Sequence, residues 1–134
     1  MPQIAIKNDQ GVTTAAEQVN ETETVIAEEG QVIVHCFIKA DAFIEKVRIW
    51  QSTFLIDNDS SHKSKLIFAD NIKVYPDWTD VAFMQNIYFT LIFSPLPKNC
   101  SLFHLLEDIP ENGGFKTSHI KRNKTDVYQV DLSD

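Results

Sequence analysis

The feature that most constrains the fold is an alternating apolar stretch that a proline-containing link separates from a second apolar stretch. Residues 87–93 read Ile-Tyr-Phe-Thr-Leu-Ile-Phe, so large apolar side chains recur at every second position, and this period places them on one face of a β-strand. Tyr88 and Ile92 make the opposite face half apolar, which predicts a central strand. Residues 94–99 hold two prolines and end the strand, and the apolar residues 100–109 predict the next one.

Short apolar runs separated by polar turns continue through the rest of the chain. We expect further strands within residues 32–38, 47–50, 53–56, 65–69, 115–120 and 128–132, with a bend or bulge at 51–52. Turns about every 8 to 12 residues are typical of a sandwich or barrel. The sequence therefore predicts an all-β fold, an antiparallel β-sandwich of seven to nine strands. Its predicted core contains Val34, Ile49, Phe89, Leu91, Phe93, Leu105 and Val130.

The N-terminal part differs in composition from the rest of the chain. Residues 4–7 alternate as a short strand does, whereas residues 8–24 are rich in Thr, Gln, Asn and Glu and carry few large apolar side chains. We therefore divide the chain into residues 1–24, a short strand with a polar linker or N-terminal extension, and residues 25–134, a single β-sandwich domain. A chain of 134 residues is long enough to bury a core of this kind.

The charge balance and the apolar runs exclude several classes of partner and location. Twelve basic and 19 acidic residues give a net charge of −7, so a nucleic-acid partner has no electrostatic footprint. No apolar run approaches the roughly 20 residues of a membrane-spanning helix. No basic segment followed by an apolar run marks a signal peptide. We expect a cytoplasmic protein from the chain as written, and a periplasmic or extracellular one if an export signal has been trimmed.

The residue types that carry chemistry are dispersed along the sequence. Cys36 and Cys100 each lie in an apolar strand pattern, which fits either two buried free thiols or a single inter-sheet disulfide. No histidine pair has the spacing of metal ligands. Cys100 and His104 share one face of a strand but lie about 13 Å apart along it, too far for a direct hydrogen bond. We predict a protein that is not an enzyme and has no metal or cofactor. The rival hypothesis is an unrecognised hydrolase built from residues far apart in the chain.

Several strand patterns together resemble a known family. They are Thr-Phe-Leu-Ile-Asp at 53–57, Ala-Asp-Asn-Ile at 69–72, Phe-Thr-Leu-Ile-Phe at 89–93, Pro-Leu-Pro at 95–97 and Phe-His-Leu-Leu-Glu at 103–107. In this order they resemble a bacterial immunoglobulin-like β-sandwich module of unknown function. The resemblance implies an immunoglobulin-like fold over about residues 32–132 and an accessory role in envelope proteins, sometimes beside thioredoxin-like domains. It implies no catalytic residues.

Three aromatic residues are the candidates for ligand or partner contact. Trp50, Tyr75 and Trp78 could form an aromatic platform, and Trp78 follows Pro76 in a loop, where part of its ring is expected to be exposed. The platform fits a carbohydrate-binding module, whereas a tryptophan that covers the end of the core is the structural alternative. Our preferred hypothesis is a non-catalytic module that binds a protein partner or forms a homodimer through a sheet edge or loop end.

Overall fold

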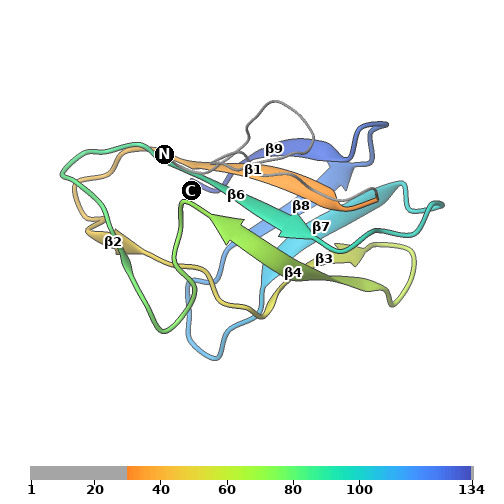
Figure 1. Ribbon diagram of the computed structural model, residues 1–134, viewed down its shortest axis with the longest axis horizontal. Coiled ribbons are helices and arrows are strands. Elements are labelled where there is room, and N and C mark those ends of the chain that lie inside the picture. The colour runs from red at the N-terminus through yellow and green to blue at the C-terminus, as the bar shows by residue number, and fades with distance from the viewer. Residues whose placement is uncertain (1–29, 134) are drawn as a thin grey trace, which may run out of the picture.

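The computed structural model describes residues 30–133, which form strands, turns and loops (Figure 1). Nine strands lie within this range: β1 (Val32–Ile38), β2 (Lys46–Val47), β3 (Thr53–Asp57), β4 (Lys63–Asp70), β5 (Thr79–Asp80), β6 (Ile87–Phe93), β7 (Leu102–Glu107), β8 (Lys116–Lys121) and β9 (Val127–Asp131). In this part of the chain no helix is long and apolar enough to cross a membrane. The all-β prediction is confirmed. The predictions for residues 4–7 and 8–24, and the boundary between 24 and 25, lie outside the described residues.

Seven strands form one mixed sheet in the order β8-β7-β3-β4-β6-β1-β9, and β2 pairs with β5 in a separate ribbon. Neighbours in the large sheet are antiparallel except β1 and β9, which are parallel, with Ile33 opposite Val127. The prediction of a purely antiparallel fold is therefore wrong for this pair. Alternation determines which face of the sheet a side chain occupies. It does not determine whether a strand distant in sequence pairs in the parallel or the antiparallel direction.

The link at 94–101 joins two strands that do not pair with each other. The four strands β3, β4, β6 and β7 lie in the spatial order β7-β3-β4-β6, which is the order of a Greek key. The proline-containing link carries the chain from the β6 side of this unit to the β7 side. The two apolar stretches that are adjacent in sequence are thus separated in the sheet by β3 and β4.

Strand β4 belongs to two groups of strands. Its first residues pair with β3, as Lys63 does with Ile56, and its later residues pair with β6, as Asp70 does with Thr90. The register shifts between Leu66 and Phe68, and Ile67, the extra residue, is exposed. A bulge of this kind bends a strand and increases its twist, so β4 turns the sheet between its two halves.

The curvature brings the two edges of the sheet toward each other, so that it nearly closes into a barrel. Edge strands β8 and β9 are joined by residues 122–126 alone, so they must meet at that end. They diverge toward the other end of the molecule (Figure 1). We call the gap between them the seam.

The concave side of the sheet holds the core. All seven predicted core residues are buried, and Phe93 and Phe103 are the largest of the fully buried side chains. Cys36 and Cys100 are both buried and unpaired, in agreement with the free-thiol interpretation and not with a disulfide. Burial raises the pKa of both thiols, so neither is a ready nucleophile at neutral pH.

Candidate binding site

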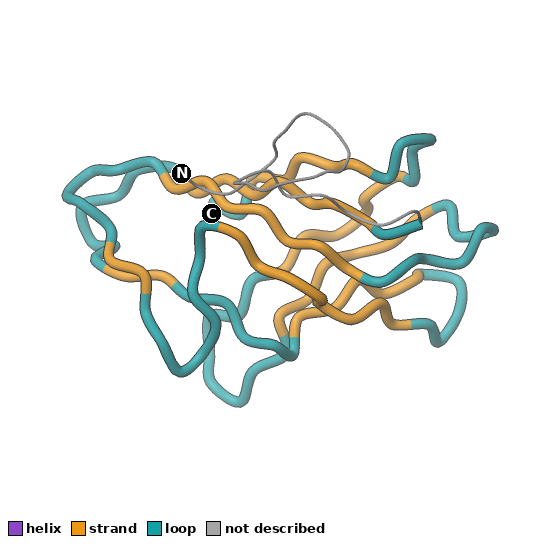
Figure 2. Tube along the Cα trace, viewed as in Figure 1, coloured by secondary structure: helices purple, strands orange, loops and turns teal. Residues whose placement is uncertain are grey.

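The links between strands gather at two ends of the molecule that differ in size (Figure 2). One end holds the turn at 58–62, the link at 94–101 and the turn at 122–126. We call it the clamp end. The other holds the loops at 39–45 and 108–115 and the long segment 71–86, which contains β5. We call it the open end.

The open end brings together all three aromatic residues that the sequence singled out. The rings of Trp50 and Tyr75 stack with centroids 3.9 Å apart and planes 25° apart. The guanidinium carbon of Arg48 lies 3.7 Å from the ring centroid of Trp78, 4.6 Å from that of Tyr75 and 5.9 Å from that of Trp50. Arg48 therefore lies at the centre of the group, where each contact is a cation–π interaction. We call these four residues the aromatic cluster.

A short backbone ladder positions the aromatic cluster. Ile49 donates its N–H to the carbonyl of Lys73 at 3.0 Å, and Tyr75 donates to the carbonyl of Ile49 at 2.8 Å. Ile49 is fully buried, so Arg48 and Trp50, its neighbours in an extended segment, point to the opposite side. The predicted bend occurs at Gln51 and separates this segment from β3. Alternation alone did not identify Arg48 as part of the site, because its two shorter ring contacts are with Tyr75 and Trp78 of another segment.

A buried carboxylate lies beside the aromatic cluster. Glu107, at the end of β7, is 5% exposed and accepts hydrogen bonds from the N–H groups of Trp50 at 2.9 Å and Phe115 at 3.1 Å. Burial raises the pKa of Glu107, although both hydrogen bonds and the charge of Arg48 oppose this shift. A Cβ on Gly114 would lie 2.5 Å from the Glu107 carbonyl oxygen, so this loop approaches β7 too closely for any side chain there.

Glu107 also lines a pocket of about 220 Å³ that adjoins the aromatic cluster. Arg48, Trp50 and Trp78 form one part of its wall, and Glu111 and Asn112 of the loop at 108–115 form another. The pocket thus combines aromatic rings, a cation and polar groups, which are the components of an orienting ligand site.

The open end also carries the most exposed apolar side chains among the described residues. Phe43 is 93% exposed and Phe83 is 81% exposed, and Met84 is half exposed. The Asn86 side chain accepts a hydrogen bond from the Ala40 N–H at 2.8 Å, which ties the two loops together. We call Phe43, Phe83 and Met84 the apolar tip. Sequence reasoning missed it, although pairs of large apolar residues between strands, Phe43-Ile44 and Phe83-Met84, are a signal for such a site.

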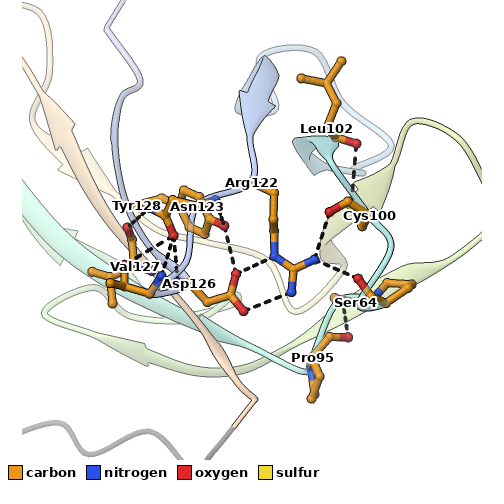
Figure 3. A network of polar contacts seen from close by, with 11 residues as sticks. Ser64, Pro95, Cys100, Leu102, Arg122, Asn123, Asp126, Val127 and Tyr128 are labelled. Atoms are coloured by element: carbon orange, nitrogen blue, oxygen red, sulfur yellow. Dashed lines mark hydrogen bonds and ion pairs between the residues drawn. The ribbon is translucent and has the colours of Figure 1, made fainter.

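The clamp end is instead closed by Arg122 (Figure 3). Its Nε and Nη2 donate to the two carboxylate oxygens of Asp126 at 2.6 and 3.0 Å, and its Nη1 donates to the carbonyls of Pro97 at 2.7 Å and Cys100 at 3.1 Å. Tyr128 donates its hydroxyl proton to Asp126 at 2.9 Å. Arg122 therefore bridges the turn at 122–126, in which it lies, and the link at 94–101.

Carboxylates at the clamp end are stabilised in their charged form. Asp57 accepts hydrogen bonds from the Asp59 N–H and the Ser60 hydroxyl, and these lower its pKa. Burial alone would raise the pKa of Asp126, but the hydrogen bonds from Arg122 and Tyr128 hold it below its usual value. These hydrogen bonds pair the polar groups of the turns and hold the adjoining strand ends in place.

Among the described residues, the Asp57 carboxylate interacts with both the Cys100 thiol and His62, whereas the other candidate groups make separate contacts. His104 makes a 2.9 Å hydrogen bond with the Asn58 side chain, and the Cys100 thiol donates to the Leu102 carbonyl at 3.6 Å. His35 is engaged with the Thr90 hydroxyl at 2.8 Å. Within residues 30–133 no three His, Cys, Asp or Glu side chains are grouped so that they could hold a metal ion.

Comparisons of this chain with protein-family models, with curated proteins and with solved structures found no match.

Proposed function

We propose that this protein is a non-catalytic module that binds a protein partner through its open end. The observation that carries the proposal is the apolar tip, where two neighbouring loops expose Phe43 and Phe83 almost completely. Contiguous exposed apolar groups on a globular protein typically mark an interaction surface. The aromatic cluster lies on the same end and adds Trp and Arg, the residue types that contribute most to binding at protein interfaces.

We further propose that the fold is an immunoglobulin-like β-sandwich, as the sequence resemblance implies. The Greek-key order of β7-β3-β4-β6 supports this fold. So does β4, because its bulge divides the strands into a group of β4, β6, β1 and β9 and a group of β4, β3, β7 and β8. An accessory module of this kind needs no catalytic group.

The proposal is tested by removing the apolar tip without touching the core. The double variant Phe43→Ser/Phe83→Ser should fold normally and lose the partner that the wild-type protein captures from its native cells. Tyr88→Ser is the matched control, because Tyr88 is also an exposed aromatic residue but lies on β6. Equal capture of the same partner by the wild type and the double variant would contradict the proposal.

A second copy of the chain is the simplest partner, since symmetric homodimers are the commonest assemblies. Size-exclusion chromatography with light scattering distinguishes a dimer from a monomer over a range of concentrations. A dimer that the double variant converts to a monomer would identify the partner directly. A dimer that persists in the double variant would place the contact at another surface.

Carbohydrate binding is a second candidate, favoured by the pocket beside Trp78. The Trp78 side chain is 43% exposed and borders the same pocket as Glu111 and Asn112. However, the guanidinium of Arg48 already covers one part of the Trp78 ring at 3.7 Å, which reduces the area on which a sugar ring can stack. A glycan array with Trp78→Ala as the control decides the question: binding that this variant abolishes would support the carbohydrate candidate.

A further inference from the structure

The seam between β8 and β9 widens into a pocket at the open end. The pocket has a volume of about 380 Å³ and is lined by apolar side chains, among them Ile38, Phe115 and Leu132, and by the charged residues Lys39, Asp41 and Lys46. Phe115 immediately precedes β8 and Leu132 immediately follows β9. The pocket therefore lies where the two edge strands have diverged furthest from the turn that joins them. It shares Lys46, Val47 and Phe115 with the pocket beside the aromatic cluster.

Along this seam, the edge of β9 presents backbone groups that have no partner among residues 30–133. The Ile33 N–H donates to the Asp126 carbonyl and the Leu132 N–H to the Phe37 carbonyl. With this parallel register, the backbone groups of Tyr128 and Val130 point toward β1, and those of the alternate residues point away from it.

The outward groups of β9 are satisfied at one end only. At the clamp end, the Val127 N–H donates to the Thr125 hydroxyl at 3.3 Å, and the Val127 carbonyl accepts from the Asn123 side chain at 2.8 Å. The outward N–H and C=O groups of Gln129 and Asp131 have no such partner among residues 30–133. The outward groups without a partner in this range therefore lie beyond Val127, on the part of β9 that is nearer the pocket.

The facing edge, β8, has features that block strand addition. It carries a lysine at each end, Lys116 and Lys121, and its register against β7 is irregular opposite Phe103 and Leu105. His119 within it has a φ of 58°, which breaks the extended conformation. Charged residues and bulges on an edge strand prevent another strand from pairing with it. Of the two sides of the seam, β9 is the one that can accept a strand.

We infer that an extended segment of the partner protein adds to the β9 edge at Gln129 and Asp131 and inserts an apolar side chain into the 380 Å³ pocket. This inference rests on the proposed protein-binding function and names the chemistry of the partner. Strand addition supplies the main-chain donors and acceptors that the edge lacks, and the pocket selects alternate side chains of the added strand. The recognised segment has apolar residues at alternate positions, one of which meets Ile38, Phe115 and Leu132 in the pocket.

The inference is tested with substitutions that change the backbone but not the fold. Gln129→Pro removes an N–H that points away from β1, and proline is tolerated on an edge strand in that orientation. Gln129→Ala is the matched control, because it removes the side chain and keeps the N–H. The probe is a phage-displayed library of random 12-residue peptides panned on the full chain, followed by affinity measurements on the synthetic form of the most enriched peptide.

We expect the enriched peptides to carry apolar residues at alternate positions. Gln129→Pro should weaken their binding at least about tenfold, whereas Gln129→Ala should leave it nearly unchanged. In the free protein, hydrogen exchange should be fast at the amides of Gln129 and Asp131 and slow at those of Val130 and Leu132. Failure to enrich any peptide, or equal binding by the proline variant and the wild type, would overturn the inference. Peptides that depend on Phe43 and Phe83 but not on the Gln129 N–H would leave the proposed function standing and remove strand addition.

Discussion

The clamp end and the open end are both built from links between β-strands, yet they treat their polar and apolar groups in opposite ways. At the clamp end, two hydrogen bonds from Arg122 to the carbonyls of Pro97 and Cys100 tie the turn at 122–126 to the link at 94–101, and two more hold Asp126 within the turn. At the open end, longer loops expose Phe43 and Phe83 and leave two pockets between them and the sheet.

The difference shows how one curved sheet can be stable and still have a surface for binding. The edge strands β8 and β9 are held together at the clamp end by the hydrogen bonds of Arg122. They can therefore separate at the open end. The stability of the fold should therefore depend on the clamp end, and its interactions should depend on the open end. Four measurements test this division, in order of decreasing expected effect.

The largest effect is expected from a matched pair of phenylalanines. Phe103 of β7 is completely buried and meets Tyr128 of β9 edge to face, with centroids 5.0 Å apart. Phe103→Ala should lower the free energy of unfolding by about 3–5 kcal/mol, because it leaves a cavity between the two halves of the sheet. Phe43→Ala, the same substitution at the open end, is the control for chemical denaturation. Similar losses in both variants would contradict the division between the ends.

Arg122→Ala should have the next largest effect. The substitution leaves the Asp126 carboxylate and the carbonyls of Pro97 and Cys100 without their shared donor, at a cost of about 2–3 kcal/mol. Arg122→Lys keeps the charge but cannot form the two-pronged contact with Asp126, so we expect about half of that loss. A lysine variant as unstable as the alanine variant would show that the geometry of the donors, and not the charge, is decisive.

The pH dependence should have opposite signs at the two ends. The folded-state pKa of Asp126 is lowered, so its contribution to stability is present above its unfolded pKa of about 3.9 and is lost as the pH falls through the folded pKa. The folded-state pKa of Glu107 is raised, so its charged form is disfavoured in the fold. Protonation of Glu107 relieves that penalty as the pH falls from neutral toward its unfolded pKa of about 4.3.

The two contributions can be separated by subtracting variants from the wild type at each pH. Unfolding free energies should show that the advantage of the wild type over Asp126→Asn shrinks as the pH falls below about 4. As the pH is lowered from neutral to about 4, the free energy of unfolding of the wild type should instead rise relative to that of Glu107→Gln. Curves of the same sign for both pairs would refute this assignment of the carboxylates.

The smallest effect on stability is expected from the apolar tip. Phe43→Ser/Phe83→Ser should change the free energy of unfolding by no more than about 0.5 kcal/mol, because both side chains already contact water. The same variant should show the largest effect on partner binding. A loss of several kcal/mol in thermal or chemical denaturation would mean that these loops support the fold.

Sequence periodicity predicted the parts of the fold that depend on single strands. The alternation in 87–93 and at 128, 130 and 132 correctly identified strands and their buried faces, because the period of two is a local property. It did not predict that β9 lies parallel to β1, or that the strands on either side of 94–101 find different partners. Those choices depend on contacts between distant segments, which no local pattern contains.

The candidate site was predictable in its aromatic members but not in its polar ones. Trp50, Tyr75 and Trp78 stand out because large aromatic residues near a proline loop are few. Arg48 and Arg122 are not distinguishable from other basic residues until the fold shows that one lies among three rings and the other among carbonyls. The edge groups of Gln129 and Asp131 depend on the β1–β9 register and have no signal in the sequence.

The parallel pairing of β1 with β9 also determines when, during translation, the sheet around β1 can be completed. Strand β1 is translated before both of its neighbours, β6 and β9, so neither side is covered until residues 87–93 and then 127–131 have been translated. During that interval the nascent chain exposes an apolar strand whose hydrogen-bonding groups are open to other chains. Completion of this sheet therefore waits until residues 127–131 have left the ribosome, and until then β1 depends on other contacts for protection from aggregation.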